Sequence, residues 1–363
     1  MSAPPGPGSA PLASPRRLEP VIECAAVGKV FRTWRREKGL RGIWKNFFAR
    51  ERVDYVALDR IDLSVASGEF VGLIGPNGAG KTTLVKALCG IVPTSSGHAR
   101  VLGRECFALD DARKARIALV MGQRSQLWWD LPPIDSFHLL REIYRVERAD
   151  FERRVGDYAA RLGVVDRLTV PLRHLSLGQR MMMEIIGAFL HDPALVFLDE
   201  PTIGLDLVSR ETIRGALVEI NRERGATIVL TSHDMEDIEA TCGRLVILSQ
   251  GRILYDGDLV ALQQRIAGRR SVVIHLEPGS PGLGASAREE IARSFGAEVA
   301  HAAPLALTLL VPAERTQALV RHLFGSLAVR DLSIERQPLE NLIKEIFTRR
   351  SLHETLPLAR SAP

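Results

Sequence analysis

The sequence contains little cysteine and no long apolar run, and each absence excludes a class of protein. Cysteine occurs four times in 363 residues, and no two cysteines have the CxxC spacing of a zinc or redox site. A disulfide-stapled secreted domain is therefore excluded, and a reducing, cytoplasmic compartment is expected. No segment approaches the ~20 apolar residues of a membrane-spanning helix. Residues 1–20 lack the apolar core of a signal peptide, so we expect a disordered tail there.

The apolar runs and helical periodicities that are present predict an α/β domain. The composition, 46% hydrophobic and 25% charged, is that of a globular protein. Strands are predicted at residues 21–31, 56–64, 70–74, 194–198, 227–231 and 244–248. The last three are mostly apolar, as expected for parallel strands buried on both faces. Helical spacing dominates residues 135–163, and a glycine-rich loop joins the strand at 70–74 to a helix at 81–89. This strand-loop-helix order is typical of a nucleotide-binding domain.

The glycine-rich loop contains a complete phosphate-binding motif. Residues 75–82 (GPNGAGKT) match the pattern G-x-x-x-x-G-K-[ST]. The glycines let backbone N–H groups wrap phosphates without an intervening Cβ, and the helix N-terminus favours negative charge. We therefore expect Lys81 to bridge the β- and γ-phosphates and the Thr82 hydroxyl to ligate Mg²⁺.

Two adjacent acids, Asp199 and Glu200, end an apolar strand. The carboxyl end of a parallel strand faces the ligand crevice of such a sheet. Asp199 is expected to hold Mg²⁺, directly or through water, and Glu200 to polarise an attacking water as general base. Taken by itself, the pair could equally be an acidic turn without a ligand.

The segment at residues 175–179 (LSLGQ) is a second candidate anion site. It precedes a helix predicted at residues 180–190, so it presents a hydroxyl, backbone N–H groups and a helix dipole to an anion. One chain does not need two such sites for one phosphate, but two head-to-tail copies could each serve the other's nucleotide. The alternative for Ser176 in isolation is a helix N-cap without a ligand.

In this order the motifs resemble the ATP-binding subunit of an ABC transporter, over about residues 21–268. The resemblance implies catalytic roles for Glu200, His233 and Gln123. It identifies Gln123 with the Q-loop glutamine that senses Mg²⁺ and water, and His233 with the switch histidine that contacts the γ-phosphate. Gln126 is a second, weaker candidate for the Q-loop position.

The resemblance also implies ATP and Mg²⁺ as cofactors and assigns their contacts. It places Mg²⁺ at Thr82, Gln123 and Asp199. Nucleotide contacts are implied for Phe31, Gly75, Pro76, Asn77, Gly78, Ala79, Gly80, Lys81, Thr82 and Thr83. Phe31 matches the aromatic residue that stacks on adenine, with Tyr55 as the alternative because an insertion follows Phe31.

Two further motifs are assigned in the same way. Ser176, Leu177, Gly178 and Gln179 match the signature that contacts ATP on the second copy, with Leu177 in place of the usual glycine. Asp206 matches the D-loop aspartate. The implied assembly is a pair of ATPase subunits, expected to be a homodimer, at the cytoplasmic face of the cell membrane.

The resemblance implies that ATP hydrolysis powers a separate integral membrane permease. Residues 123–132 (QRSQLWWDLP) resemble an exporter-type subgroup, which implies export of a lipophilic or amphiphilic compound or a glycoconjugate. Trp128 and Trp129 either meet the permease or pack within the helical subdomain. The alternative function is a soluble, non-transport ABC ATPase acting on the ribosome or nucleic acid. Such proteins typically duplicate the core or carry a long coiled coil, and this chain has no sustained heptads.

The net positive charge of the chain is concentrated around one insertion, residues 32–52. The chain carries 48 basic and 43 acidic residues, and nine of the basic residues against two acidic ones lie between Lys29 and Arg52. Apolar residues at positions 40, 43, 44, 47 and 48 form one helical face there. The insertion is expected to lie against inner-leaflet lipid, against a permease, or on its own domain. Nucleic acid is not expected, because nothing else resembles a recognition module.

The predicted fold class is α/β: a P-loop ABC ATPase core with a helical subdomain, followed by a small α+β domain. The core spans residues 21–268 and its helical subdomain about 124–190. The accessory domain spans 269–350, before a tail at 351–363. Its predicted elements are a strand at 271–276, helices at 287–295 and 313–324, a strand at 305–311, and a final helix at 338–347.

Overall fold

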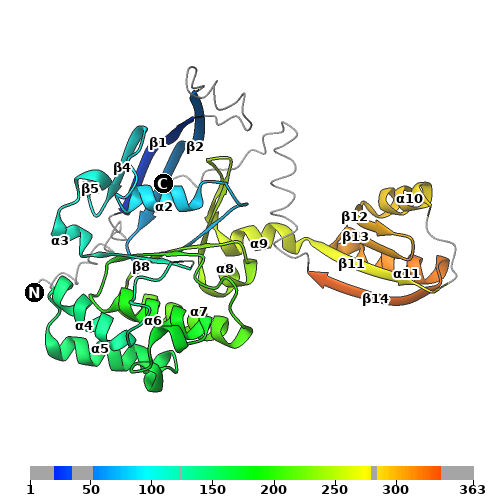
Figure 1. Cartoon of the computed structure of the whole chain (residues 1–363). Helices are drawn as coiled ribbons and strands as arrows, with labels where there is room; N and C mark the ends of the chain where they lie inside the picture. The colour runs from blue at the N-terminus through cyan, green and yellow to red at the C-terminus, as the bar shows by residue number, and fades with distance from the viewer. Residues whose placement is uncertain (1–19, 35–51, 123, 279–283, 337–363) are drawn as a thin grey trace, which may run out of the picture.

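The computed structural model describes residues 20–34, 52–122, 124–278 and 284–336. Within these ranges a central sheet is covered on both faces, and a smaller β-sheet unit follows toward the C-terminus (Figure 1). No helix in the described part of the chain combines the length and the hydropathy that a membrane span requires. The predicted final helix at residues 338–347 and most of the basic insertion lie outside the described residues.

The central sheet has six strands in the order β10-β9-β3-β8-β7-β6. The strands are β3 (Phe70–Ile74), β6 (Ile117–Met121), β7 (Leu195–Asp199), β8 (Thr227–Ser232), β9 (Arg244–Ser249) and β10 (Arg252–Asp258). Five strands run parallel, and β10 pairs antiparallel with β9 at one edge. This arrangement confirms the predicted α/β class.

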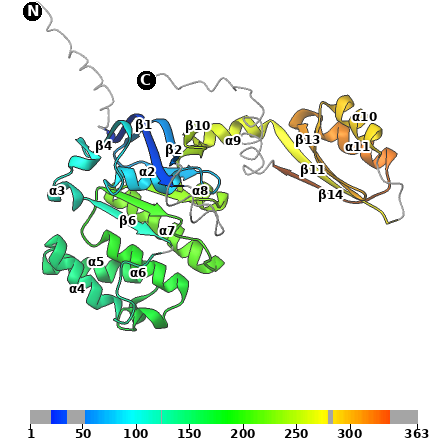
Figure 2. The ribbon, with the colours of Figure 1, turned by 45° about the horizontal axis from the view of Figure 1, so that its top comes forward.

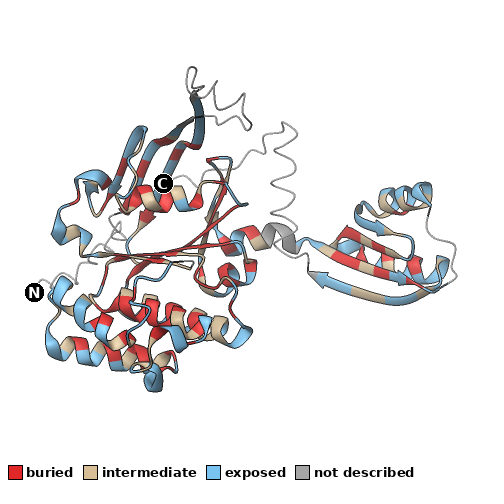
Figure 3. Ribbon diagram, in the orientation of Figure 1, coloured by how far each residue is buried: buried red, intermediate tan, exposed pale blue. Residues whose placement is uncertain are grey.

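Alternate residues of the parallel strands face two different hydrophobic cores. In β3, for example, Val71 and Leu73 pack into one core, whereas Phe70 and Ile74 pack into the other. A sheet buried on both faces requires apolar side chains at consecutive positions, which explains the uninterrupted apolar runs. Figure 3 shows this buried layer running through the middle of the molecule.

The helices form two layers around this sheet. On one side lies α2 (Lys81–Leu88), and on the other lie α6, α7 and the helical subdomain (Figures 1 and 2). The helices on this other side include α4 (Pro133–Tyr144), α5 (Arg148–Arg161), α6 (Leu177–Phe189) and α7 (Leu207–Arg224). The remaining short helices of this region are α3 (Asp111–Lys114), α8 (Met235–Thr241), α9 (Leu259–Ala267) and the 3-10 turns Cys106–Ala108, Val165–Arg167 and Leu172–His174.

A second, antiparallel sheet packs beside α2. It has the order β2-β1-β4-β5, with β1 (Pro20–Trp34), β2 (Arg52–Ala66), β4 (Ser96–Val101) and β5 (Arg104–Glu105). β1 extends three residues beyond its predicted end at Phe31, because it continues to pair with the start of β2. Residues 32–34 and 52 of the expected insertion are therefore strand, and residues 35–51 lie outside the described residues.

The C-terminal unit has the element order β-α-β-β-α-β. It consists of β11 (Arg269–Leu276), α10 (Ala285–Phe295), β12 (Glu298–Ala303), β13 (Ala306–Pro312), α11 (Thr316–Ser326, after the 3-10 turn Ala313–Arg315) and β14 (Val329–Arg336). Its sheet order is β12-β13-β11-β14, with every pair antiparallel. Apolar residues of the sheet and both helices, such as Ile274, Leu309 and Leu319, form a core of their own.

Candidate nucleotide site

The phosphate loop leaves β3 and enters α2 through two glycines that no other residue could replace without strain. A Cβ on Gly75 would lie 2.1 Å from the backbone oxygen of Leu248. Gly80 has φ of +110°, and a Cβ there would lie 2.6 Å from the Ala57 oxygen. The backbone of residues 75–80 is therefore held against two neighbouring strands, in the compact form that leaves its N–H groups for an anion.

Lys81 lies inside this loop. Its Nζ donates to the carbonyl oxygens of Gly75 at 2.7 Å and Pro76 at 3.4 Å, and the side chain is only 6% exposed. Burial lowers the pKa of the Lys81 ammonium, while the charges of Glu200 and Asp199 oppose that shift. A cation placed here is ready to exchange its carbonyl partners for phosphate oxygens.

Thr82 and Asp199 meet across the sheet edge, as expected for two residues that share a cation. The Thr82 Oγ1 donates to Asp199 Oδ2 at 2.9 Å, and Thr231 Oγ1 donates to Asp199 Oδ1 at 2.6 Å. Hydroxyl and carboxylate oxygens are the donors that Mg²⁺ prefers. The oxygen atoms of Thr82 and Asp199 therefore fit this ion.

Glu200 follows Asp199 in a left-handed backbone conformation, with φ of +54°. Its N–H donates to the Thr231 carbonyl oxygen at 3.0 Å and to Thr231 Oγ1 at 3.1 Å. Such a conformation costs about 1–3 kcal/mol in a residue other than glycine and persists where neighbours hold it. Here Thr231 holds Glu200 from one side. On the other side Gly122 approaches so closely that a Cβ on it would lie 2.1 Å from the Glu200 oxygen.

Glu200 also lies between the two side chains expected around the γ-phosphate, those of Lys81 and His233. Its Oε1 is 3.9 Å from Lys81 Nζ and 3.8 Å from His233 Nδ1. Lys81, the adjacent pair Asp199 and Glu200, and His233 come from three segments, which follow β3, β7 and β8, and the parallel sheet brings them to one edge because these strands end there. The arrangement brings a cation, two carboxylates and an imidazole close together.

The two aromatic residues expected to stack on adenine lie together beside the phosphate loop. Phe31 and Tyr55 are directly paired across β1 and β2, and their side chains are 38% and 52% exposed. Lys29 Nζ lies 4.9 Å from the Phe31 ring centre. The Tyr55 hydroxyl donates to the Gly78 oxygen at 3.3 Å, so Tyr55 also touches the phosphate loop. The structure brings both rings to the same face of this sheet.

The signature turn forms a capping box at the start of α6. Gln179 N–H donates to Ser176 Oγ at 3.2 Å, and Ser176 N–H donates to Gln179 Oε1 at 3.1 Å. Because Ser176 caps the helix, α6 begins at Leu177, three residues before the predicted start. Leu177 is 42% exposed, and a Cβ on Gly178 would lie 2.2 Å from Ser209 Oγ in α7.

Asp206 caps α7 next to the signature turn. Its Oδ1 accepts from Ser209 N–H at 2.9 Å and its Oδ2 accepts from Ser209 Oγ at 2.7 Å. The backbone hydrogen bond from Ser209 is the largest of the causes that lower the pKa of Asp206, so this carboxylate stays charged. The turns that carry Ser176 and Asp206 thus lie side by side, in contact through Gly178 and Ser209.

Gln123, expected as a catalytic residue and an Mg²⁺ ligand, lies outside the described residues. The second candidate, Gln126, has its side chain engaged elsewhere, since Nε2 donates to the Leu119 oxygen. Its N–H donates to the Glu184 carboxylate at 3.0 Å. Gln126 is therefore held against β6 and α6.

The tryptophans after this segment lie at the surface. Trp128 and Trp129 are each 49% exposed, so packing inside the helical subdomain accounts for only part of each ring. The Arg180 guanidinium lies 4.8 Å from the Trp129 ring centre, and Trp128 N–H donates to Ser136 Oγ at 3.1 Å. α6 thus contacts the tryptophan segment directly.

Sequence reasoning missed two residues that hold the site. Thr231 contacts both Asp199 and Glu200, and Gly122 leaves room for the Glu200 backbone. The sequence did contain a signal for Thr231, because it ends a predicted apolar strand and stands two positions before His233. Gly122 had no comparable signal, because its neighbour is 78 positions away along the chain.

Known proteins are similar to this chain in sequence and in fold. The profile of the ABC transporter family matches residues 58–203. The chain is 30% identical to the ABC transporter ATP-binding protein NatA of Bacillus subtilis (strain 168) over 208 residues, which are 57% of this chain and 84% of NatA. It is 32% identical to the linearmycin resistance ATP-binding protein LnrL of the same strain, over 57% of this chain and 66% of LnrL.

Other matches differ in length or show the fold alone. The chain is 36% identical to ribose import ATP-binding protein RbsA 1 of Burkholderia thailandensis, over 67% of this chain and only 49% of that protein. A solved ATP-binding subunit of an ABC transporter, 25% identical, superimposes with a TM-score of 0.56 over 68% of this chain and 92% of its own. A dimeric bacterial ABC transporter cassette, 23% identical, has a TM-score of 0.55 over 66% and 98%.

The fold and the site define a P-loop ATPase of the cassette type. The chain belongs to the ABC transporter family and contains its ATP-binding domain. It is an ATPase, and its family role is that of the ATP-binding subunit of a transporter.

Proposed function

We propose that this chain is the ATP-hydrolysing subunit of an export system, working as a pair beneath a separate membrane permease. The observation that carries the catalytic part is the meeting of Lys81, Asp199, Glu200 and His233 at one sheet edge. Thr82 and Asp199 would hold Mg²⁺, which supplies charge neutralisation at the phosphates. Lys81 would bind the β- and γ-phosphates, and Phe31 or Tyr55 would stack on the base.

Glu200 would orient water and accept its proton at a carboxylate oxygen. Its backbone is held by Thr231, so the carboxylate has a defined starting position between Lys81 and His233. His233 would donate to the γ-phosphate from the opposite side. General-base assistance of this kind contributes about 10²- to 10⁴-fold to the rate.

The pairing of two copies is supported by the signature turn. The hydrogen bonds of Ser176 and Gln179 lie within their own turn at the exposed start of α6, and Leu177 is 42% exposed there. This turn offers a helix N-terminus and a hydroxyl to an anion. A second copy in head-to-tail orientation would bring its nucleotide to this turn, with Asp206 beside the contact.

Docking to a permease is supported by the segment that follows Gln123. Exposed tryptophans are common anchors of protein interfaces, and Trp128 and Trp129 lie next to one another on the surface. The preceding residues, 124–127, line a cavity of about 470 Å³ together with α4 and α6. A cytoplasmic segment of the permease would enter here, which would keep the ATPase at the cytoplasmic face of the membrane.

The relatives do not share one direction of transport, since the ribose relatives are import proteins by name. It rests on residues 123–132 and on likeness to the linearmycin resistance protein. We propose a lipophilic or amphiphilic compound, or a glycoconjugate, as the exported substrate.

Purification of the tagged chain from detergent-solubilised membranes should retain an integral membrane protein. Co-sedimentation with ribosomes in high salt would instead favour the soluble, non-transport alternative.

The catalytic assignment is tested by Glu200→Gln. This variant should bind ATP and form a stable dimer in size-exclusion chromatography, while its turnover falls at least about 100-fold because water activation is lost. Glu152→Gln, which removes an exposed acid on α5, is the matched control and should turn over normally. Normal turnover by Glu200→Gln would refute the role of Glu200.

A further inference from the structure

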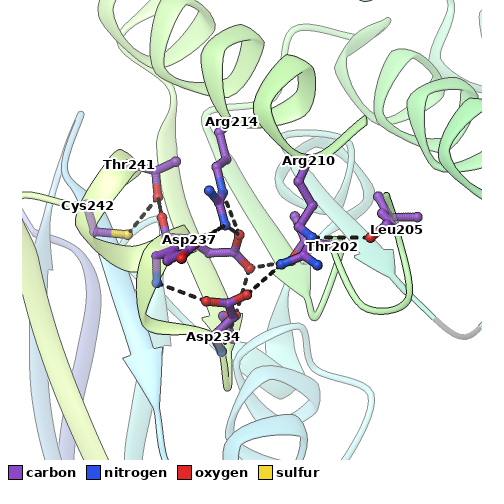
Figure 4. A network of polar contacts seen from close by, with 10 residues as sticks. Thr202, Leu205, Arg210, Arg214, Asp234, Asp237, Thr241 and Cys242 are labelled. Atoms are coloured by element: carbon purple, nitrogen blue, oxygen red, sulfur yellow. Dashed lines mark hydrogen bonds and ion pairs between the residues drawn. The ribbon is translucent and has the colours of Figure 1, made fainter. Parts of the chain in front are cut away.

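Two arginines one turn apart on α7 contact the segment that follows β7 and Glu200, and the segment that follows β8 and His233. Arg210 points from α7 toward the turn at residues 202–205 and toward Asp234, next to His233, whereas Arg214 points toward Asp237 in α8 (Figure 4). Their partners belong to segments about 30 positions apart in the chain. α7 therefore connects the turn that follows Glu200 with the loop that carries His233.

Asp237 is the centre of the inner half of this network. Its side chain is fully buried, and it pairs with Arg214, whose Nε donates to Oδ1 at 2.6 Å. Its other oxygen accepts from Ser232 Oγ at 2.9 Å and from Thr202 Oγ1. A buried carboxylate with these partners has one low-energy position, because losing any partner leaves charge or a polar group unpaired. Of the two hydroxyl donors, Thr202 follows Glu200 by two positions, and Ser232 ends β8 directly before His233.

Arg210 forms the outer half. Its Nε donates to the Leu205 oxygen at 3.2 Å, and its Nη1 pairs with Asp234 Oδ2 at 2.8 Å. Asp234 N–H in turn donates to Ser232 Oγ at 3.0 Å. Leu205 directly precedes the D-loop residue Asp206. The Arg210 guanidinium thus connects Leu205, which precedes the D-loop residue Asp206, with Asp234, which follows His233.

His233 itself has little to hold it. Its side chain is 55% exposed and reaches Glu200 Oε1 only at 3.8 Å. Both of its neighbours are fixed, since Ser232 donates to Asp237 and Asp234 pairs with Arg210. The network therefore holds the backbone from which the imidazole extends.

We propose that Arg210, Arg214 and Asp237 are positioning residues for ATP hydrolysis, which set the place of His233 and tie it to the D-loop turn. The proposal rests on the catalytic role given above to His233. A shift of the Asp206 turn when two copies meet would reach His233 through Arg210 and through Asp237. None of the three residues needs to touch nucleotide for this role.

The test is a double-mutant cycle on the full chain, with steady-state ATPase as the readout. Asp237→Asn keeps the shape of the side chain but removes its charge. We expect kcat to fall about 10- to 100-fold through misplacement of His233, while KM for ATP changes little because the phosphate loop is untouched. In a His233→Ala background the same change should produce almost no further loss, because the group being positioned is absent. Equal losses in both backgrounds would overturn the proposal.

A second variant keeps the test decisive if Asp237→Asn fails to fold. Arg210 is 30% exposed, so Arg210→Gln should fold, and it should show the same fall in kcat and the same dependence on His233. Arg161→Gln is the stability control, since Arg161 pairs with Asp157, Glu219 and Glu223 between α5 and α7, away from the site. It should lower the melting temperature without lowering kcat. An equal fall in kcat for Arg161→Gln would assign the whole effect to stability, against the proposal.

The cycle also separates this proposal from the function it rests on. If His233→Ala leaves turnover unchanged, the catalytic role of His233 fails. If His233→Ala is slow and the network variants are fast, the catalytic role stands and the positioning role is overturned.

Discussion

Glu184 shows how one buried side chain can organise the segment that precedes the tryptophans. Its carboxylate is 6% exposed and accepts hydrogen bonds from Ser125 Oγ and from the N–H groups of Gln126 and Leu127. It lies on α6, one turn after Arg180, which contacts the Trp129 ring. α6, which begins at the signature turn, therefore contacts residues 125–129 through both Glu184 and Arg180. Movement of a partner docked on Trp128 would be transmitted to the signature turn through these contacts.

The same residue predicts a dependence of stability on pH. Burial raises the pKa of Glu184 above its ordinary value of 4.5, although its hydrogen bonds oppose the shift. A raised pKa in the folded state means that its contribution to stability is present below pH 4.5 and is lost as pH rises through the folded-state pKa. Glu184→Gln should remove this loss. Melting temperatures between about pH 4 and pH 8 should then fall less for the variant than for the wild type. Parallel curves would contradict the assignment.

At the scale of elements, α5 and α6 both begin with a side-chain cap, and only one of these caps is proposed to contact nucleotide as well. Ser176 caps α6 and Glu147 caps α5, the latter accepting from Ala149 N–H at 2.8 Å and Asp150 N–H at 3.2 Å. Both caps satisfy backbone donors that a helix leaves unpaired. Only the first is proposed to meet a nucleotide held by a second copy.

This difference can be measured with two alanine variants. Ser176→Ala and Glu147→Ala should each lower the free energy of unfolding by about 1 kcal/mol, because each removes an N-cap. Denaturant titration would measure that loss. ATPase activity should fall only for Ser176→Ala, since only Ser176 is expected at the nucleotide. Equal activities in the two variants would remove the signature role of Ser176.

At the scale of the whole molecule, the described residues form three hydrophobic cores. Two lie on the faces of the central sheet, and the third is enclosed within residues 269–336. The third core takes all of its buried residues from residues 272–323. The boundary predicted at 268/269 falls between α9 and β11, where the third core begins.

We therefore expect a chain ending at Gly268 to fold and hydrolyse ATP. Its kcat should remain within about threefold of the full chain, because the residues proposed to contact nucleotide all precede the cut. Thermal unfolding of the shortened chain should stay cooperative. Aggregation, or a turnover far below that of the full chain, would show that the C-terminal unit supports the ATPase core and would contradict the predicted boundary.

The sequence by itself determined the features that depend on neighbouring residues. The phosphate loop at 75–82 was predictable because its shape follows from glycines within a few positions of one another. The buried strands were predictable because burial on both faces demands consecutive apolar residues, and the α/β class followed from their alternation with helices. The family resemblance then added the order of the motifs.

Only the tertiary structure decided which distant residues meet. The contact of Thr231 with Asp199, the pairing of Arg214 with Asp237, and the exposure of Trp128 depend on how strands and helices pack. The left-handed backbone at Glu200 likewise depends on Thr231 and on the space that Gly122 leaves. Local sequence cannot specify such contacts, because their energies arise between segments that folding brings together from far apart along the chain.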